Sequence, residues 1–236
     1  DWFRKRGGAP HPHQIDLLKN AQRGEDTLLI APTGAGKTLA GFLPSLVDLA
    51  DQKRGSISRS LHTLYISPLK ALAVDIERNL EFPIRDIGLD IRVETRTGDT
   101  PQAKRVRQAQ RPPDILLTTP EQVSLLLAHR EAKKLFGDLK FVIIDELHAI
   151  APTKRGELLA LALSRLRALA PPLVIIGLSA TIRNKDELCA YLVSQTQPNS
   201  RSTLIEVEET VKPTIRILRS QSRLPLAGHT ALSSMI

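Results

Sequence analysis

The chain alternates between two kinds of hydrophobic pattern. Short runs such as FVII at 141–144 are apolar at every position, whereas the longer segments between them repeat apolar residues every three or four positions. The first pattern is typical of strands buried on both faces, and the second of helices with one apolar face. We therefore expect strands at residues 27–31, 62–67, 91–95, 114–118, 141–145 and 173–179, and helices at 15–23, 37–51, 69–80, 102–110, 121–128, 157–168 and 185–193.

This alternation of strand and helix predicts an α/β fold with a mostly parallel sheet and helices on both faces. After residue 193 the pattern weakens, and SQTQPNSRS resembles a linker. We expect one main domain at residues 1–195 and a connector at 196–236, within which 203–207 and 214–218 could form strands.

The composition allows a real core and gives no sign of a membrane protein. Hydrophobic residues make up 42% of the 236 positions, yet no apolar run approaches the ~20 residues that cross a bilayer. The N-terminal DWFRKRGG lacks the apolar stretch of a secretory signal, and the single cysteine, Cys189, cannot form an internal disulfide. We expect a cytoplasmic protein with no membrane partner.

The net charge of +8 favours an anionic partner, of which nucleic acid is the most common. Aromatic residues are only 3% of the chain. Because proteins that hold bases by stacking need aromatic side chains, this composition is better suited to holding phosphates.

A phosphate-binding loop follows the first expected strand. The segment PTGAGKT lies between that strand and a helix, so glycines can turn the backbone amides toward one anion at the helix N-terminus. A formal phosphate loop begins with Gly, where this chain has Ala31. Lys37 can reach the β and γ phosphates of a nucleotide, and Thr38 can offer its hydroxyl to Mg²⁺. The residues expected to surround the phosphates are Thr33, Gly34, Ala35, Gly36, Lys37 and Thr38.

Two carboxylates end the strand at 141–145, where a buried strand delivers Asp145 and Glu146 to its own tip. A nucleoside triphosphate carries a Mg²⁺ that requires a carboxylate on a rigid neighbouring strand, and we assign Asp145 to the metal. Hydrolysis also requires a group that orients and deprotonates the attacking water, and we assign Glu146 to that role. The chain is thus predicted to use a nucleoside triphosphate with Mg²⁺, and the family resemblance given below implies that the nucleotide is ATP.

A GTPase is less consistent with these residues. The D-x-x-G motif of GTPases would place glycine where this chain has His148. Asn184 and Lys185 match the start of the guanine-reading N-K-x-D motif, but residue 187 is Glu.

Three motifs in order, APTGAGKT, DELH and SAT, resemble those of superfamily 2 DExH-box helicases, in which Ala31 is a usual first residue of the loop. The resemblance implies a RecA-like P-loop NTPase domain. It also implies that Gln14 of HPHQ reads adenine and that His148 bridges the nucleotide site to the SAT segment. The segment that couples this site to nucleic acid would be Ser179, Ala180 and Thr181.

The same resemblance identifies a path for the nucleic-acid backbone. SPLKALAVD, RTGD and TTPEQ are similar to the family's motif Ia, the loop that follows it and motif Ib. The residues implied to contact the strand are Pro68, Lys70, Arg96, Thr97, Gly98, Thr119, Pro120 and Glu121.

Longer segments, such as LHTLYISPLKALAVDIERNL and VIIDELHAIAPTKRGELLAL, resemble the large helicase-related (Lhr) group, in particular its bacterial ligase-associated branch. The resemblance implies movement on single-stranded DNA in repair, with a DNA ligase and a repair nuclease as possible partners. It also implies a second RecA-like domain that supplies an arginine finger, a motif that these 236 residues do not contain. An RNA-directed helicase, or a nucleotide-dependent switch that moves a partner protein, remains the alternative.

Overall fold

A computed structural model describes residues 8–51, 60–180, 184–193 and 201–207. Its centre is a seven-stranded sheet with the strand order β3-β4-β2-β5-β6-β1-β7, in which every pairing is parallel. The six strands predicted from their apolar runs are all present. The strands are β1 Thr27–Ile30, β2 Thr63–Ile66, β3 Val93–Arg96, β4 Ile115–Thr118, β5 Phe141–Ile144, β6 Val174–Ser179 and β7 Thr203–Glu206.

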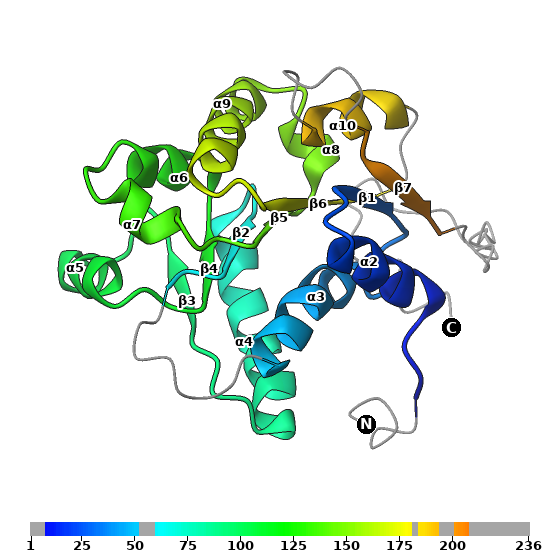
Figure 1. Ribbon diagram of the computed structural model, residues 1–236, viewed down its shortest axis with the longest axis horizontal. Helices are drawn as coiled ribbons and strands as arrows, with labels where there is room; N and C mark the ends of the chain where they lie inside the picture. The colour runs from blue at the N-terminus through cyan, green and yellow to red at the C-terminus, as the bar shows by residue number, and fades with distance from the viewer. Residues whose placement is uncertain (1–7, 52–59, 181–183, 194–200, 208–236) are drawn as a thin grey trace, which may run out of the picture.

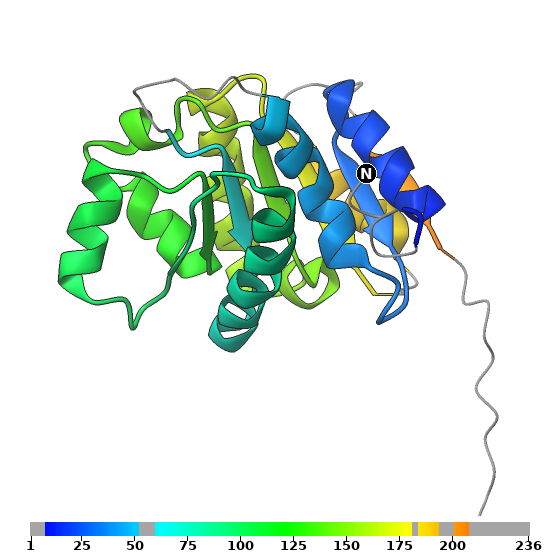
Figure 2. The same cartoon turned by 90° about the horizontal axis from the view of Figure 1, so that it is seen from below.

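Helices cover both faces of the sheet, as predicted (Figure 1). One face carries α2 Pro12–Gln22, α3 Lys37–Asp51 and α4 Lys70–Ile87, which lie in front of the sheet in Figure 2. The other face carries α5 Gln102–Gln110, α6 Pro120–Leu127, α7 Ala132–Phe136, α8 Leu147–Ile150, α9 Lys154–Leu169 and α10 Lys185–Leu192. Among the described residues, no helix has both the length and the apolar character needed to cross a bilayer.

Successive side chains of each strand point alternately to the two faces of the sheet, so the strands contribute to two separate cores. Along β5, Val142 and Ile144 pack into the cluster beneath α6 to α10, whereas Phe141 and Ile143 pack into the cluster beneath α2, α3 and α4. Because both faces are buried, a strand of this kind must be apolar at every position, which explains the uninterrupted FVII run.

One of the two strands considered possible beyond residue 195 is present, and it belongs to the sheet. This strand, β7, pairs with β1 in register, with Thr27 opposite Thr203 and Ile30 opposite Glu206. The backbone groups of β1 thus find partners on both sides, which places residues 203–206 in the sheet. The other possible strand, at 214–218, lies outside the described residues.

Three helices also differ from the prediction. Helix α4 continues past residue 80 because Ile84 extends its buried face, and Gly88, with φ of 71°, ends it. The short helices α7 and α8 were not predicted, since four or five residues are too few to show a helical period.

A buried ion pair connects the amino ends of β1 and β6 to the carboxyl end of α9. The Asp26 carboxylate, just before β1, accepts hydrogen bonds from the Ile175 amide of β6 at 2.8 Å and from the Arg167 guanidinium of α9 at 2.5 Å. Burial raises the pKa of Asp26 by more than these two partners lower it. Arg167 also donates to the carbonyl of Leu192 at 2.7 Å, so it joins α9 to α10.

We expect Arg167→Met to destabilise the domain by about 3 kcal/mol, because it leaves a buried carboxylate without its cation. Urea denaturation followed by circular dichroism measures this change in the free energy of unfolding. Lys19→Met is the matched control, since Lys19 and Asp16 form an exposed pair with side chains 59% and 56% accessible, which we expect to contribute about 0–1 kcal/mol. Equal losses for the two variants would contradict a stabilising role for the Asp26–Arg167 pair.

Candidate nucleotide and nucleic-acid site

The phosphate loop, the DELH turn and the SAT segment all lie at the carboxyl ends of strands, and a parallel sheet brings these ends to one edge. The phosphate loop follows β1, Asp145 follows β5, and β6 lies between these two strands. Ser179, at the end of β6, accepts a hydrogen bond from the Ala31 amide through its carbonyl at 3.2 Å. The fold therefore brings together three motifs that are far apart in the sequence.

The phosphate loop is accessible and sharply turned. Gly34 and Gly36 have φ of 83° and 77°, values that favour glycine, and Thr33 and Gly34 are exposed. The Lys37 ammonium donates to the carbonyl oxygens of Ala31 at 2.7 Å and Pro32 at 3.0 Å. Lys37 therefore lies over the loop, and α3 begins at this residue with the following Thr38 in its first turn.

Helix α2 is attached to the same loop through its first turn. Gln14 is buried; its side-chain oxygen accepts from the His11 amide at 2.9 Å, and its amide group donates to the Gly36 carbonyl at 3.4 Å. The His13 ring lies 3.0 Å from the Ala35 carbonyl. A side chain at Gly36 would come within 2.9 Å of Gln14, so this glycine permits the close approach. Gln14 thus supports the loop, and its reading of adenine remains a prediction.

Asp145 has a partner that the sequence analysis missed. Its carboxylate accepts hydrogen bonds from the Tyr65 hydroxyl through Oδ2 and from the Glu146 amide through Oδ1, the latter at 2.9 Å. Tyr65 of β2 lies opposite Ile143 of β5, so Asp145 comes two residues further along on the same face. Burial, followed by the Asp145 charge, raises the pKa of Tyr65, which keeps the phenol protonated as a donor.

Glu146 adopts an unusual backbone conformation directly after the strand. Among the described residues, Glu146 is the only one other than glycine with a positive φ, which is 48°. Such strain is costly and is often found at functional sites. The turn it makes allows α8 to begin at once and leaves the Glu146 side chain 39% exposed at the sheet edge.

His148 contacts the end of β6, as the resemblance implies. Its Nδ1 lies 3.1 Å from the Ser179 hydroxyl and 3.4 Å from the Ala180 amide, and 3.5 Å from a Glu146 carboxylate oxygen. One ring thus connects the DELH turn to the SAT segment. Thr181 lies outside the described residues.

The residues predicted to hold a nucleic-acid backbone continue along the same edge, because β3, β4 and β2 are neighbours. Pro68 and Lys70 follow β2, Arg96 ends β3, and Thr119 and Pro120 follow β4. Thr97 and Gly98 continue from Arg96 in the loop before α5. Lys70 lies 2.9 Å from Asp99 in an exposed ion pair, which links motif Ia to the RTGD loop.

Arg155 joins two of these segments. Its guanidinium pairs with the Glu121 carboxylate at 2.5 Å and donates to the Pro68 carbonyl at 3.1 Å. Burial on its own would raise the pKa of Glu121, but the hydrogen bonds from Arg155 and other groups outweigh it and lower the pKa. Glu121 therefore remains charged and is engaged within the protein.

The site is suited to a nucleotide with Mg²⁺. Each Asp145 oxygen accepts one hydrogen bond and retains a second acceptor position that can face a metal or its water. Asp145 and the Thr38 hydroxyl are the candidate ligands, and oxygen donors are those that Mg²⁺ prefers. Lys37 and the loop amides would neutralise the phosphates.

The fold and the arrangement of this edge are those of a P-loop helicase motor. Residues 11–188 match the family described as DEAD/DEAH box helicase, and the chain belongs to that family.

Within the family, the proteins similar to this chain include Lhr helicases. The chain is 46% identical over 206 residues to a Lhr helicase and probable uracil glycosylase of Mycolicibacterium smegmatis, covering 83% of this chain and 14% of that protein. It is 41% identical to the ATP-dependent helicase Lhr-Core of Methanothermobacter thermautotrophicus, covering 87% of this chain and 25% of that protein. The structure of Mycobacterium smegmatis Lhr bound to single-stranded DNA and AMP-PNP matches with a TM-score of 0.77 at 42% identity, over 88% of this chain and 27% of that one. The chain thus spans about a quarter or less of the length of these relatives.

We expect Tyr65→Phe to weaken nucleotide binding only when Mg²⁺ is present. The variant keeps the ring stacked on Phe42, 5.1 Å away, but removes the hydrogen bond that fixes Asp145. Titration of a fluorescent ATP analogue should show about a tenfold loss of affinity with Mg²⁺ and no change in EDTA.

The control is the chain's other tyrosine, Tyr191. It is partly buried and its hydroxyl donates to the Gly156 carbonyl at 2.6 Å, away from this site. Tyr191→Phe should leave both affinities unchanged. If Tyr65→Phe lowers the affinity for the ATP analogue equally with and without Mg²⁺, Tyr65 has only a packing role.

Proposed function

We propose that this chain is the first motor domain of an ATP-dependent helicase or translocase that moves on single-stranded DNA. The observation that carries the proposal is the shared sheet edge: the phosphate loop, the Asp145–Glu146 turn and the Ser179 segment adjoin one another, and the residues predicted to hold the strand continue along the same line. The nucleotide and the DNA strand would then bind to loops that are connected to one another.

Each polar group at the edge has a role in this proposal. Lys37 and the loop amides hold the β and γ phosphates, and Thr38 and Asp145 hold Mg²⁺. Glu146, exposed beside Asp145, orients and deprotonates the attacking water. His148, in contact with Ser179, communicates the state of this site to the SAT segment.

Hydrolysis would require a further cation. The described residues hold the phosphates on one side, whereas an arginine that stabilises charge on the transferring phosphoryl group contributes roughly 10³–10⁵ in rate in related machines. We propose that a second RecA-like domain of the full-length protein supplies it. On this basis the 236-residue chain binds Mg·ATP and hydrolyses it very slowly.

The biological setting is proposed from the resemblance to the ligase-associated branch. It supports a role in DNA repair with a DNA ligase and a repair nuclease as partners. The alternative is a nucleotide-dependent switch or an RNA-directed helicase. One measurement distinguishes it from the proposed DNA helicase. The ATPase of the complete protein should rise with single-stranded DNA, and a rise with RNA alone, or none with either, would favour the alternative.

Glu146→Gln and Lys37→Ala should separate water activation from nucleotide binding. Because Glu146 is assigned to water, its variant should keep Mg·ATP affinity in this chain and, in the complete protein, abolish turnover while ATP stays bound. Lys37→Ala should instead lose affinity, since it removes the phosphate-binding cation. Isothermal titration and ATPase assays measure the two effects. Brisk ATPase of the isolated chain that survives Glu146→Gln would refute the role of Glu146.

Lys70→Gln should flatten the salt dependence of strand binding. Each phosphate contact on a single strand adds about −0.7 to the slope of log K against log salt concentration, so the variant should lose about that much. Fluorescence anisotropy with labelled single strands of two base compositions measures slope and base preference together. Lys133→Gln, an exposed lysine of α7 away from the path, is the control. An altered base preference with an unchanged slope would argue against contact with the backbone.

A further inference from the structure

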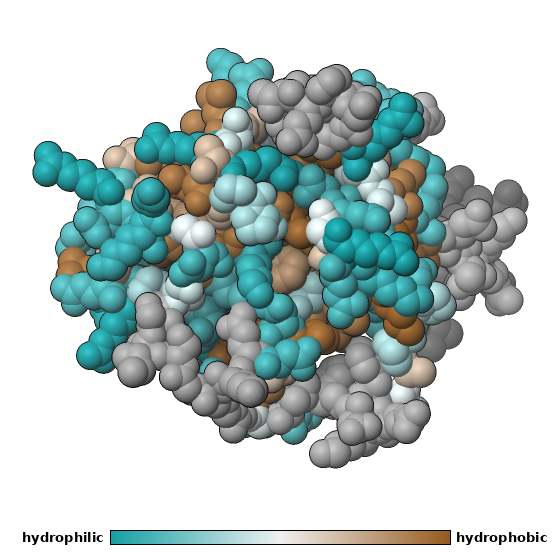
Figure 3. All heavy atoms as spheres, viewed as in Figure 1, coloured by the Kyte–Doolittle hydropathy of each residue, from teal (hydrophilic) through white to brown (hydrophobic). Residues whose placement is uncertain are grey.

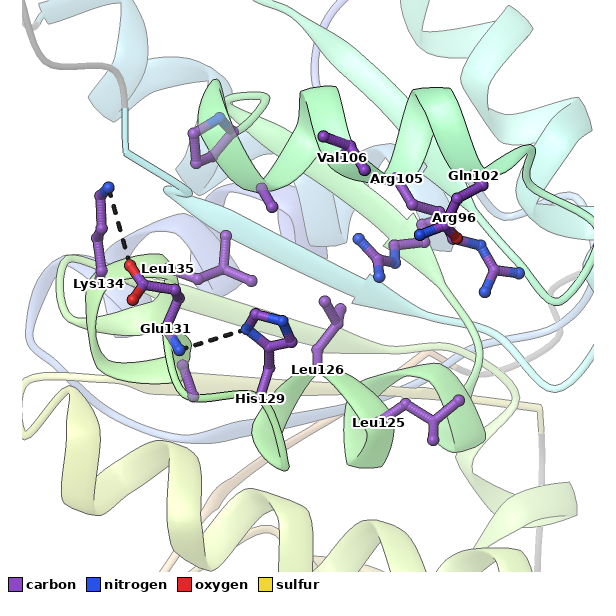
Figure 4. Close-up of a pocket in the computed structure, with 13 residues that line it drawn as sticks. Arg96, Gln102, Arg105, Val106, Leu125, Leu126, His129, Glu131, Lys134 and Leu135 are labelled. Carbon is purple, nitrogen blue, oxygen red and sulfur yellow. Dashed lines mark hydrogen bonds and ion pairs between the residues drawn. The ribbon is translucent and has the colours of Figure 1, made fainter.

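A pocket lies away from the nucleotide site, between α5 on one side and α6 and α7 on the other (Figure 4). Its volume is about 220 Å³. Arg96, Arg105 and Val106 line one side, and Leu125, Leu126 and His129 face them across the opening. The pocket therefore combines two guanidinium groups with aliphatic walls.

Arg96 is an uncompensated cation in this pocket. Its Nε is buried and has no hydrogen-bond partner in the described part of the chain. Burial, and then the charge of Arg105, lower the pKa of the Arg96 guanidinium, which shows that its surroundings disfavour a positive charge. The acid on the lining, Glu131, pairs instead with Lys134 at 3.9 Å. The Arg96 side chain as a whole is only partly buried and lines the pocket, so an anionic group in the pocket would balance its charge without reaching Nε.

Arg105 is held in a different way. Its guanidinium donates to the carbonyl oxygens of Thr97, Gly98 and Thr100, at 3.3, 2.6 and 2.8 Å. These bonds fix its position beside Arg96 and occupy part of its donor capacity. Arg105 thus adds positive charge to the pocket, whereas the Arg96 guanidinium is the group left to donate hydrogen bonds to a bound anion.

The walls of the pocket are aliphatic and accessible. Val106 is 46% exposed and Leu125 61% exposed, and both belong to the small set of large hydrophobic side chains that reach the surface of the described residues. Figure 3 shows hydrophobic residues among polar ones at the surface where α5, α6 and α7 lie. None of the described residues that line this pocket is Phe, Tyr or Trp. Since bases bind by stacking on aromatic rings, the lining favours an aliphatic side chain over a nucleobase.

We propose that this pocket is a docking site for an acidic, leucine-rich segment of a protein partner, which inserts an aliphatic side chain between α5 and α6 and places a carboxylate on Arg96. The charge of the lining supports this occupant, because Glu131, the one acid that lines it in the described part of the chain, is paired with Lys134, which leaves the charges of Arg96 and Arg105. A carboxylate forms a bidentate pair with a guanidinium, and the aliphatic walls remove apolar surface from water. Such a site would attach the motor domain to a partner without occupying the nucleotide site.

The experiment uses the 236-residue chain and a synthetic peptide, acetyl-ELLEELLE-amide, labelled with a fluorophore. The matched peptide has Gln in place of every Glu, so it keeps the leucines and loses the carboxylates. Fluorescence anisotropy gives the affinities, and NMR chemical shifts locate the bound peptide. We expect saturable binding of the acidic peptide, shifts confined to α5, α6 and α7, and binding at least about tenfold weaker for the neutral peptide.

Two variants test the two halves of the pocket. Arg96→Gln removes the cation and Leu125→Ser removes an exposed part of the wall; each should weaken the acidic peptide about tenfold or more. Lys133→Gln, which removes a charge from α7 outside the lining, and Leu161→Ser, which removes a leucine of α9 that is 73% exposed, should have no effect. Thermal unfolding by circular dichroism verifies that the Leu125→Ser chain is folded, as its exposure leads us to expect.

Three results would overturn the proposal. The first is the absence of saturable binding, and the second is equal affinity for the acidic and neutral peptides. The third is an affinity for the acidic peptide that Arg96→Gln lowers and Leu125→Ser leaves unchanged. That last result would reduce the site to a charge contact in which the aliphatic wall takes no part.

Discussion

The structure depends on one constraint: a parallel sheet that is buried on both faces. Such strands cannot turn back on themselves, so each is followed by a helix that returns along one face, and every strand ends at the same edge. The apolar residues of β5 and β6 serve only to bury the sheet. Their effect on function is indirect and decisive, because they fix where the polar residues that follow them must lie.

The polar groups at that edge hold one another in place through hydrogen bonds. Asp145 is fixed by Tyr65 and by the Glu146 amide, His148 contacts Ser179, and Lys37 lies over the carbonyls of its own loop. Preorganised groups of this kind lose little freedom when charge arrives. The left-handed backbone of Glu146 is part of the same arrangement, since a conformation of this cost persists only when its surroundings determine it.

The edge predicted to hold the nucleic-acid strand and the pocket share a structural element. Arg105 lines the pocket and, through three carbonyl oxygens, supports the 97–100 loop. On the other side of that edge, Arg155 joins Glu121 to the Pro68 carbonyl. Arginine suits both positions, because its planar fork can reach several acceptors at once. The loops that follow β2, β3 and β4 are therefore cross-linked by side chains as well as by the sheet.

The sequence by itself determined the class of fold and most of the elements, and it predicted the chemistry of the nucleotide site. Short apolar runs rich in β-branched residues and bounded by turn residues favour buried strands, and the residue types of PTGAGKT and DELH predict a mechanism. Only the tertiary structure decided which strands are neighbours. The sequence could not pair Tyr65 with Asp145, 80 positions apart, because that pairing follows from β2 lying beside β5. The sequence also could not show that β7 joins the sheet, or that Arg96 and Leu125 line the same pocket. Short or polar segments take their positions from the elements that pack around them.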